Sequence, residues 1–600
     1  MPDFPALRLS LAARLPVAPY TAASMGVLLI AAYLCLVNLD YAALWHDEAS
    51  AAFFGKTLLQ QGSITGWDGR NLVGGTNGRT LNEELRDVLP PLMYVLNAVG
   101  FALFGVNEIG ARVVHAVIGI VALGVFYLLL RQHLPKHPRL MFLIFTFAAG
   151  SAQLLLYFRQ SRYFSVMVLS LILLFYLYER YWRSRNSAYL PVIALVAALS
   201  FFNHYAGGAA TMLSLAVYHL IFRARATTGR EWVLFAICGA AVAALGAGYL
   251  YWLGVIGGER SGFIGFAGQN PTPYQGDKSE LVLFIERIWI YTRELFTADW
   301  ISWPVFLWFA GVALISWQAR RKQAVGASRQ VRRRGQRANG SASIAQKILG
   351  DDFPLAAAGK VILMGALFAL FSAMLSVQPI WVNPFADRRY YVGALPLLLA
   401  MKGLFVEWAW RRHVMVGTVA LVVLLSTSVG AAPFNMVMFF SGQRTLGLHL
   451  FEFIREVHRP YRDSISVVSS YLLQNAEKDD LVYVPDFAYH EALIFYAGDH
   501  VRFCCILDET TPLPKDKIAA LDAPLYYIEQ NTPDWIIFFR QLQLGAAKQF
   551  IVKPFTGMYE VVAQLEIYPY PTQRPELNMH AFSPLDPGDR GVFILRHQEK

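Results

Sequence analysis

An acidic pair follows the first hydrophobic stretch of the chain. Asp47 and Glu48 stand in the run Trp45-His46-Asp47-Glu48-Ala49, just after the apolar residues 22–39. Ionised carboxylates near a bilayer are costly unless they are solvated or paired, so carboxylates in such a place are candidates for function. A carboxylate beside a reacting carbon can take the proton of an acceptor hydroxyl as a general base. The simpler interpretation is a solvated helix cap at the membrane edge.

Arginines and aromatic residues occur together in two other segments, Tyr157 to Tyr163 and Asp387 to Tyr391. A planar guanidinium binds phosphate through two parallel hydrogen bonds, and cations stabilise the charge that develops on a phosphate leaving group. These residues therefore suit transfer of a group from a lipid-linked phosphate, with tyrosines lining a sugar or lipid surface. The candidate substrate-binding residues are Arg159, Arg162, Tyr163, His204, Tyr205, Arg388, Arg389 and Tyr390.

Several of these candidates also have a structural interpretation. Arg159 and Arg162 could anchor the chain to lipid headgroups. His204 could be a packed or interfacial polar residue, and Glu48 could be a solvated neighbour of Asp47. What favours function is the position of the arginines, because positive charge is unfavourable in the short loops outside the cytoplasm.

The composition is that of a membrane protein. Of the 600 residues, 56% are hydrophobic and only 16% are charged, whereas about a quarter of a soluble domain is charged. The apolar stretches have close to the ~20 residues that cross a bilayer as a helix. They are residues 22–39, 91–107, 111–130, 140–157, 163–178, 188–203, 207–222, 232–253, 301–317, 357–377, 390–408 and 413–431. We predict a mainly α, polytopic membrane domain over residues 1–439 and a soluble domain over residues 440–600.

The basic loops predict the topology, because short loops rich in lysine and arginine stay in the cytoplasm. The five basic loops are residues 131–139, 180–185, 223–230, 320–347 and 411–412. All five face the cytoplasm only if the stretch 91–107 does not cross. That stretch is slightly short and begins at Pro90-Pro91, so we predict a helix in the outer interface. About eleven transmembrane helices remain, with an outer loop 40–110, a cytosolic basic loop 319–356 and an extracytoplasmic C-terminal domain.

Charge, cysteines and the N-terminus narrow the class further. The net charge of +10 lies largely in the short loops and in the run 320–347, which indicates anionic lipid rather than nucleic acid as a neighbour. The first apolar stretch, preceded by Arg8 and Arg14, is interpreted as an uncleaved anchor. We expect no bridge between the adjacent Cys504 and Cys505, and neither a disulfide framework nor a thiolate metal site.

The tail after residue 440 has the alternation of a small α/β domain. Its expected helices are residues 465–476 and 488–497, and its expected strands are residues 481–485, 501–506, 535–539, 558–568 and 591–596. No catalytic set stands out there. A lid over the membrane site and a surface that recognises the acceptor are both open interpretations of this domain.

These motifs resemble those of a known family. The run Trp45 to Ala49 is similar to the acidic motif in the first outer loop of the GT-C glycosyltransferases, which include protein O-mannosyltransferases, lipid A aminoarabinose transferases and rhizobial galacturonosyltransferases. Pro90-Pro91-Leu92, then Phe104 to Glu108, then Arg112, resembles the family's next segment. The resemblance covers about residues 24–430 and concerns the superfamily rather than any one member.

The resemblance implies roles for the acidic pair. The family's candidate base corresponds to Asp47, and Glu48 would be a supporting or metal-linked carboxylate. Such enzymes use polyprenyl-phosphate sugars and typically invert the anomeric centre. The chain departs from the family at Leu89, because the family often has a basic residue directly before the Pro-Pro pair. The sugar specificity of a particular member therefore does not carry over.

We thus expect a hexosyl- or pentosyltransferase of the bacterial inner (plasma) membrane. Its partners would be a polyprenyl-phosphate sugar donor, a glycolipid, glycan or protein acceptor, and membrane lipids, without nucleic acid. No cofactor is certain, and a divalent metal is left open because no ligand spacing argues for one. The alternatives are a transporter or flippase of an anionic lipid and a non-catalytic subunit that binds polyprenyl lipids. A transporter would usually show repeats and broken helices at mid-membrane, which the sequence does not.

Overall fold

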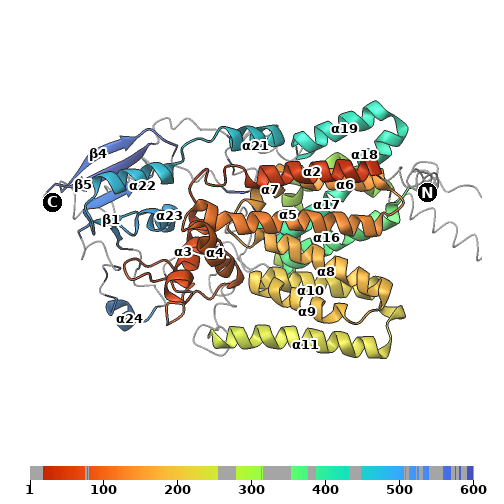
Figure 1. Ribbon diagram of the computed structural model, residues 1–600, viewed down its shortest axis with the longest axis horizontal. Helices are drawn as coiled ribbons and strands as arrows, with labels where there is room; N and C mark the ends of the chain where they lie inside the picture. Colours follow the sequence, from red (N-terminus) through yellow and green to blue (C-terminus); the bar gives the residue numbers. More distant parts are fainter. Residues whose placement is uncertain are drawn as a thin grey trace, which may run out of the picture.

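The computed structural model contains a bundle of long helices with a smaller sheet-containing domain at one end (Figure 1). It describes residues 18–74, 78, 80–253, 279–312, 314, 353–375, 387–431, 447–505, 507, 513–521, 523, 525, 532–539, 558–568, 574–575, 580, 582 and 591–598. Predictions for Arg8 and Arg14, for the basic run 320–347 and for the domain boundary at residue 439 lie outside these residues. The side chain of Arg388 also lies outside them.

Most helices of the bundle form from the apolar stretches, because a helix satisfies its own backbone groups where water is absent. The exception is α13, which none of the predicted stretches covers. The helices are α2 (Ala18–Leu36), α5 (Glu108–His133), α6 (Pro138–Ala149), α7 (Ala152–Phe158), α8 (Phe164–Ser184), α9 (Tyr189–Asn203), α10 (Tyr205–Phe222), α11 (Gly229–Trp252), α13 (Glu280–Thr297), α16 (Leu355–Leu375), α17 (Leu395–Leu398), α18 (Ala400–Arg412) and α19 (Val414–Ser426), with short 3-10 turns at η2 (Ala224–Ala226), η4 (Asp387–Ala394) and η5 (Val429–Ala431).

The described part of the chain has seven helical segments that are long and apolar enough to cross a membrane. The bent pair α6–α7 adds an eighth candidate, and shorter apolar helices lie at Leu92–Phe104, Tyr189–Asn203, Trp303–Val312 and Val414–Ser426. Each of the eleven stretches predicted to cross falls on one of these segments, which confirms a mainly α, polytopic fold. How many of them cross stays a prediction.

Two helices lie across one end of the bundle rather than alongside it. They are α3 (His46–Gln61) and α4 (Leu92–Phe104), and together with the C-terminal domain they define what we call the capped end (Figure 1). The two helices approach closely at Gly55, where an added Cβ would lie 2.6 Å from the Cβ of Asn97. Gly105 then turns the chain into α5 with a φ of 85°, a conformation that glycine adopts without strain.

The loops that connect the helices lie at the two ends of the bundle. Helix α2 ends at the capped end and α5 begins there, so the segment 91–107 does not run the length of the bundle (Figure 1). The turns α5–α6, α8–α9, α10–α11 and α18–α19 lie at the opposite end, and they carry the basic residues of four of the five predicted cytosolic loops. Which end faces the cytoplasm stays a prediction.

A break within one pair of helices shapes the capped end. Helices α6 and α7 meet at an angle of 57° across Gly150-Ser151. The hydroxyl of Ser151 accepts a hydrogen bond from the backbone N–H of Leu154 and so caps α7 at its first turn. The short α7 ends at Phe158, and the next residues, 159–163, form the turn that leads into α8.

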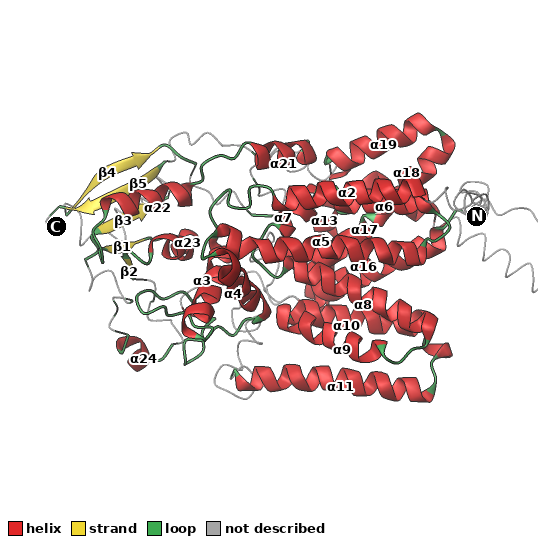
Figure 2. Cartoon of the chain, in the orientation of Figure 1, coloured by secondary structure: helices red, strands yellow, loops and turns green. Residues whose placement is uncertain are grey.

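The C-terminal domain contains a mixed five-stranded sheet (Figure 2). The strand order is β2-β1-β3-β5-β4, with β1 parallel to β2 and β3, and β5 antiparallel to β3 and β4. Its elements are α21 (His449–His458), α22 (Ser464–Asn475), β1 (Leu481–Tyr483), α23 (Phe487–Ala497), β2 (Arg502–Phe503), α24 (Lys515–Ala519), β3 (Trp535–Phe538), β4 (Tyr559–Leu565) and β5 (Val592–His597). All seven predicted helices and strands of the tail are confirmed.

Within the capped end, polar contacts join this domain to the loops before and after α3, and α23 packs on α3. The backbone N–H of Ala43 donates to Asp463 at 2.9 Å, and that of Leu44 donates to the hydroxyl of Tyr496 at 2.7 Å. Asn71 accepts from the backbone N–H of Phe503 at 2.8 Å. The loop before α3 is thus held by the C-terminal domain.

One expectation about the cysteines was wrong. Cys504 and Cys505 form a disulfide with each other at the end of β2, with Cα atoms 3.7 Å apart. The small ring closes because Cys505 adopts a left-handed backbone conformation with a φ of 65°, which the residue types alone do not reveal. Cys35 and Cys238 are free thiols.

The topology can be checked by thiol labelling in intact cells. In a Cys35→Ser, Cys238→Ser background, we expect a membrane-impermeant maleimide to label Glu83→Cys, an exposed site in the loop of the capped end. Pro135→Cys, in the exposed α5–α6 turn, should react only after the cells are permeabilised. Labelling of both positions from outside would contradict the predicted orientation.

Candidate active site

The acidic pair begins helix α3. Trp45 has an extended backbone, with φ −75° and ψ 169°, so His46 is the first helical residue and Asp47 and Glu48 lie in the first turn. Carboxylates are favoured there because the positive end of the helix dipole lies at the N-terminus. Successive helical residues point about 100° apart, so the two carboxylates face different surroundings.

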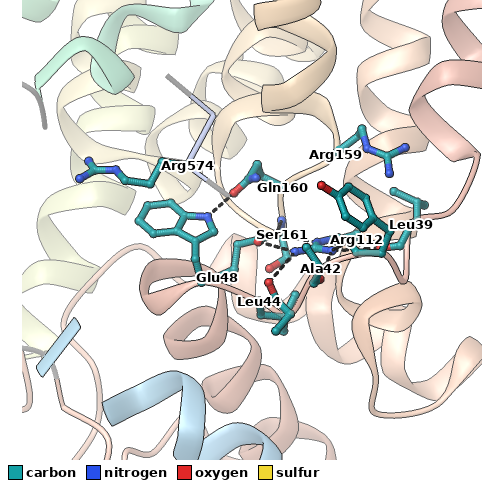
Figure 3. A network of polar contacts seen from close by, with 12 residues as sticks. Leu39, Ala42, Leu44, Glu48, Arg112, Arg159, Gln160, Ser161 and Arg574 are labelled. Carbon is teal, nitrogen blue, oxygen red and sulfur yellow. Dashed lines mark hydrogen bonds and ion pairs between the residues drawn. The ribbon is translucent and has the colours of Figure 1, made fainter. Parts of the chain in front are cut away.

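Glu48 points into the protein and is fully buried. Its Oε2 accepts from Nη2 of Arg112 at 2.7 Å, and its Oε1 accepts from Nε of Arg112 at 3.0 Å and from the backbone N–H of Ser161 at 2.8 Å (Figure 3). Both oxygens are therefore engaged in joining α3 to α5 and to the α7–α8 turn. This placement does not support the catalytic role that the sequence suggested for Glu48.

Arg112 also fixes the loop between α2 and α3. Its Nη1 donates to the carbonyls of Leu39, Tyr41 and Ala42 at 3.0, 3.1 and 2.9 Å. The remaining contact runs from Nη2 to the carbonyl of Ala43 at 3.4 Å. One guanidinium thus satisfies a run of buried carbonyls that have no partner in secondary structure, which holds the loop in a single conformation.

Arg159 has a similar structural place. Its guanidinium donates to the carbonyls of Leu34, Cys35, Val37 and Asn38 at distances of 2.7 to 3.3 Å. Leu34 and Cys35 lie in the last turn of α2, whose carbonyls lack partners within the helix, and Val37 and Asn38 directly follow it. A cation is favoured at that end of a helix. In Figure 3, Arg159 and Arg574 lie on opposite sides of Gln160. The structure therefore gives Arg159 a capping place instead of the predicted contact with substrate.

Asp47, by contrast, meets two arginines from distant parts of the chain. Its Oδ2 accepts from Nη1 of Arg389 and lies 3.7 Å from Nη2 of Arg162. Nη1 of Arg162 also donates to the backbone carbonyl of Asp47 at 3.0 Å. The side chain of Asp47 is 20% exposed, so it stays accessible while paired. Three of the residues predicted from sequence are thus brought together.

The arginines set the charge state of this carboxyl. Burial raises the pKa of Asp47, but Arg389, Arg162, His46 and Arg574 lower it by more, so the pKa lies well below its ordinary value. Asp47 is therefore a carboxylate at neutral pH. As long as it pairs with Arg389 it is a weak base, and any anion that draws the arginines away will strengthen it.

A cluster of three rings lies beside the pair, and all three were predicted from sequence. The ring centroids of Tyr163 and His204 are 4.5 Å apart, and those of His204 and Tyr390 are 5.1 Å apart. Arg162 lies over Tyr163, with its guanidinium carbon 5.3 Å from the ring centroid. Burial lowers the pKa of His204 to about 3, helped by Arg162 and Arg389, so the imidazole is neutral. These rings suit the flat face of a sugar or an isoprenoid chain.

Tyr205 lies outside this ring cluster. Its hydroxyl donates to the carbonyl of Val88 at 3.1 Å, and its ring packs against Phe201, with centroids 5.0 Å apart. Tyr205 therefore holds the loop before α4 and does not join the predicted substrate contacts.

Known proteins resemble this chain in part or in fold. A family model described as dolichyl-phosphate-mannose-protein mannosyltransferase matches residues 88–252. An uncharacterized protein from Aquifex aeolicus (strain VF5) is 34% identical over 107 residues, which is 18% of this chain and 19% of that protein. The apo crystal structure of ArnT from Cupriavidus metallidurans aligns with a TM-score of 0.52 at 13% identity, over 96% of this chain and 98% of ArnT. ArnT bound to undecaprenyl phosphate aligns over the same shares with a TM-score of 0.49 at 14% identity.

The mannosyltransferase match and the ArnT-like fold both support the resemblance to the GT-C superfamily of membrane glycosyltransferases. The match at residues 88–252 includes Arg112 and Arg162, two of the arginines that surround the acidic pair.

Several residues of this site were not proposed from sequence. Trp45 donates its indole N–H to Gln160, and Nδ1 of His46 lies 3.5 Å from Glu491 of the C-terminal domain. Arg574, also from that domain, lies over Trp45. The sequence did not indicate that Glu491 and Arg574 belong to the site, because more than 400 residues separate them from α3.

Asp87 is a second buried carboxyl near this site. It accepts from the hydroxyl of Tyr94 and from the backbone N–H of Leu89, the latter at 3.1 Å. Burial raises its pKa to about 7; Tyr94 and Leu89 oppose this rise and Glu491 adds to it. Its place three residues before Pro90 was the one available signal in the sequence.

No group of three or more His, Cys, Asp and Glu side chains within the described ranges is arranged to hold a metal ion. Both carboxylate oxygens of Glu48 accept hydrogen bonds from Arg112. Metal dependence stays open.

The buried pair predicts a large loss of stability in Glu48→Ala. That change leaves the charge of Arg112 buried without its carboxylate, which costs about 3–5 kcal/mol. We expect the thermal unfolding midpoint in detergent micelles to fall sharply. Glu84→Ala is the matched control, because its 3.2 Å ion pair with Arg86 is exposed and worth at most about 1 kcal/mol. Equal thermal unfolding midpoints for Glu48→Ala and Glu84→Ala would contradict a stabilising role of the buried pair between Arg112 and Glu48.

Asp87 predicts a pH dependence of stability. Because its folded pKa is raised from 3.8 to about 7, its protonated form is stabilised by folding, and that stabilisation is lost as the pH rises from about 4 through 7. Unfolding midpoints of the wild type should therefore fall relative to Asp87→Asn between pH 5 and pH 8. Glu84→Gln serves as the exposed control. The difference between its unfolding midpoint and that of the wild type should not change over this pH range. A difference between wild type and Asp87→Asn that does not change with pH would refute the assignment.

Proposed function

We propose that this chain transfers a sugar from a polyprenyl-phosphate donor to a hydroxyl acceptor with inversion at the anomeric carbon. The single observation that carries the proposal is the ionised Asp47, accessible and held between Arg389 and Arg162 beside the rings of Tyr163, His204 and Tyr390. One site thus combines a base, two cations suited to phosphate and a flat surface suited to a sugar.

The chemistry follows from these groups. The acceptor hydroxyl gives its proton to Asp47 while its oxygen attacks the anomeric carbon from the face opposite the phosphate. The bond between that carbon and the phosphate oxygen breaks, and its electron pair stays with the phosphate. The phosphodiester donor carries one negative charge and the polyprenyl phosphate product carries two. Arg389 and Arg162 are placed to stabilise the second charge as it forms.

The ion pair between Asp47 and Arg389 couples the two halves of this reaction. A donor phosphate competes with Asp47 for the arginines. As the arginines turn toward the phosphate, the carboxylate loses its partner, and its pKa rises toward the range of a useful base. The base is thereby strengthened when the donor is in place.

We further propose that the capped end faces the extracytoplasmic side of a bacterial inner membrane. The four basic turns at the opposite end support this orientation, because short basic loops are retained in the cytoplasm. The donor would then reach the site from the bilayer, and the acceptor would reach it from the side of the C-terminal domain. Undecaprenyl phosphate, the ligand named for one ArnT structure, is a lipid of the proposed donor class.

Asp47→Asn tests the assigned base. Loss of a general base should lower transfer by about 10²- to 10⁴-fold. Binding of undecaprenyl phosphate should persist or tighten, because Arg389 and Arg162 lose a competing carboxylate. Transfer is followed by mass spectrometry of envelope glycans and glycolipids in cells that carry the wild type, Asp47→Asn or no gene, which also identifies the sugar.

Glu83→Gln provides the control for the loss of one acidic residue at the capped end, since Glu83 is exposed in the loop. We expect it to transfer like the wild type. Full transfer by Asp47→Asn would remove Asp47 as the base. A product unchanged by deletion of the gene would instead argue for a transporter of an anionic lipid or a non-catalytic lipid-binding subunit.

A further inference from the structure

The C-terminal domain places one cation at the membrane site. The guanidinium carbon of Arg574 lies 5.4 Å from the centroid of the Trp45 ring, and that of Arg389 lies 5.8 Å from the same centroid. Figure 3 shows Arg574 beside the indole, with Gln160 near the indole N–H. Because Trp45 directly precedes the helix that carries Asp47, Arg574 belongs to the surroundings of the base although it comes from the other domain.

Buried contacts fix the position of Arg574. Its backbone carbonyl accepts from Nδ1 of His580 at 2.9 Å. Nε2 of His580 pairs with Glu456 at 2.8 Å, and both of these side chains are almost fully buried. Glu456 in turn accepts from the hydroxyl of Tyr41, in the loop that Arg112 holds. A continuous chain of polar contacts thus leads from the loop before α3 to the backbone of Arg574.

The orientation of the Trp45 ring, over which Arg574 lies, is also fixed. The hydrogen bond from Trp45 to Gln160 orients the indole ring, and Gln160 directly precedes Ser161, the backbone donor to Glu48. A guanidinium over an indole is attracted by the negative face of the ring. A guanidinium also suits recognition of phosphate oxygens, which accept from two parallel N–H groups.

We propose that Arg574 binds the phosphate of the polyprenyl donor, so that the C-terminal domain completes the donor site with a third cation beside Arg389 and Arg162. This inference rests on the proposed function for the identity of the ligand. It assigns the domain a direct part in donor binding, in place of a lid or an acceptor-recognition surface alone. The electrostatic influence of Arg574 on the pKa of Asp47 is in keeping with this place.

Arg574→Ala in the full-length protein tests the proposal. We expect the Kd for undecaprenyl phosphate in detergent to rise about 10- to 100-fold, the effect of losing a charged hydrogen bond. Arg574→Lys should recover part of the affinity, because it keeps the charge but loses the planar fork. Undecaprenol, which lacks the phosphate, should bind all variants equally weakly.

Arg596→Ala is the matched control. Arg596 lies in the same domain, with its guanidinium carbon 5.2 Å from the centroid of the Trp535 ring. Its removal takes away the same kind of contact between arginine and tryptophan, so a general loss of domain stability would appear in both variants. We expect Arg596→Ala to bind undecaprenyl phosphate like the wild type, with thermal unfolding of each variant recorded alongside.

The outcomes separate this inference from the proposed function. Unchanged affinity in Arg574→Ala overturns the inference, even if Asp47→Asn abolishes transfer. Unchanged affinity with a raised KM for the acceptor also overturns it, because Arg574 would then serve the acceptor. Equal loss of affinity in Arg574→Ala and Arg596→Ala overturns it as well. Weakened binding in Arg574→Ala alone supports it, even if the wild type transfers no sugar and the proposed function fails.

Discussion

The capped end depends on one buried ion pair, Arg112 with Glu48. The carboxylate brings together the start of α3, the first turns of α5 at Arg112 and the α7–α8 turn at Ser161. Such a pair is favourable only when its geometry and remaining hydrogen bonds are complete, since both charges leave water. The carbonyls of Leu39 to Ala43 complete them. The adjacent residue, Asp47, is consequently held in one direction, toward the arginines of the site.

The four arginines near the acidic pair make two different kinds of contact. Arg112 and Arg159 donate to backbone carbonyls near the end of α2, whereas Arg162 and Arg389 reach Asp47. Arg159 and Arg162 are only three residues apart, but they lie in the turn between α7 and α8, where helical spacing does not decide which way a side chain points. The residue type predicted arginines at this site. Only the fold distinguishes the arginines that bind backbone carbonyls from those that contact Asp47.

The bundle and the tail domain could be predicted because each depends on local pattern. Apolar stretches of near-spanning length gave the helices, and alternating short runs gave the strands around β1 and β3. The site could be predicted only in part. Asp47, Arg162, Arg389, Tyr163, His204 and Tyr390 come together, while Glu48 and Arg159 turn to structural partners. Arg574 and Glu491 had no signal, because contacts across hundreds of residues depend on how the tail docks, and the Cys504–Cys505 bridge depends on a left-handed residue.

Docking of the tail follows from the same constraint that fixes the loop before α3. Carbonyls of this loop accept hydrogen bonds from Arg112. Its backbone N–H groups at Ala43 and Leu44 donate to Asp463 and Tyr496 of the C-terminal domain. A buried backbone N–H without a partner costs as much as a lost hydrogen bond, so this loop is fully satisfied only when the C-terminal domain is in place. The network through Tyr41, Glu456 and His580 extends that dependence to Arg574. Because Asp47 follows Trp45 and this loop directly in the chain, the position of its carboxylate depends on both domains at once.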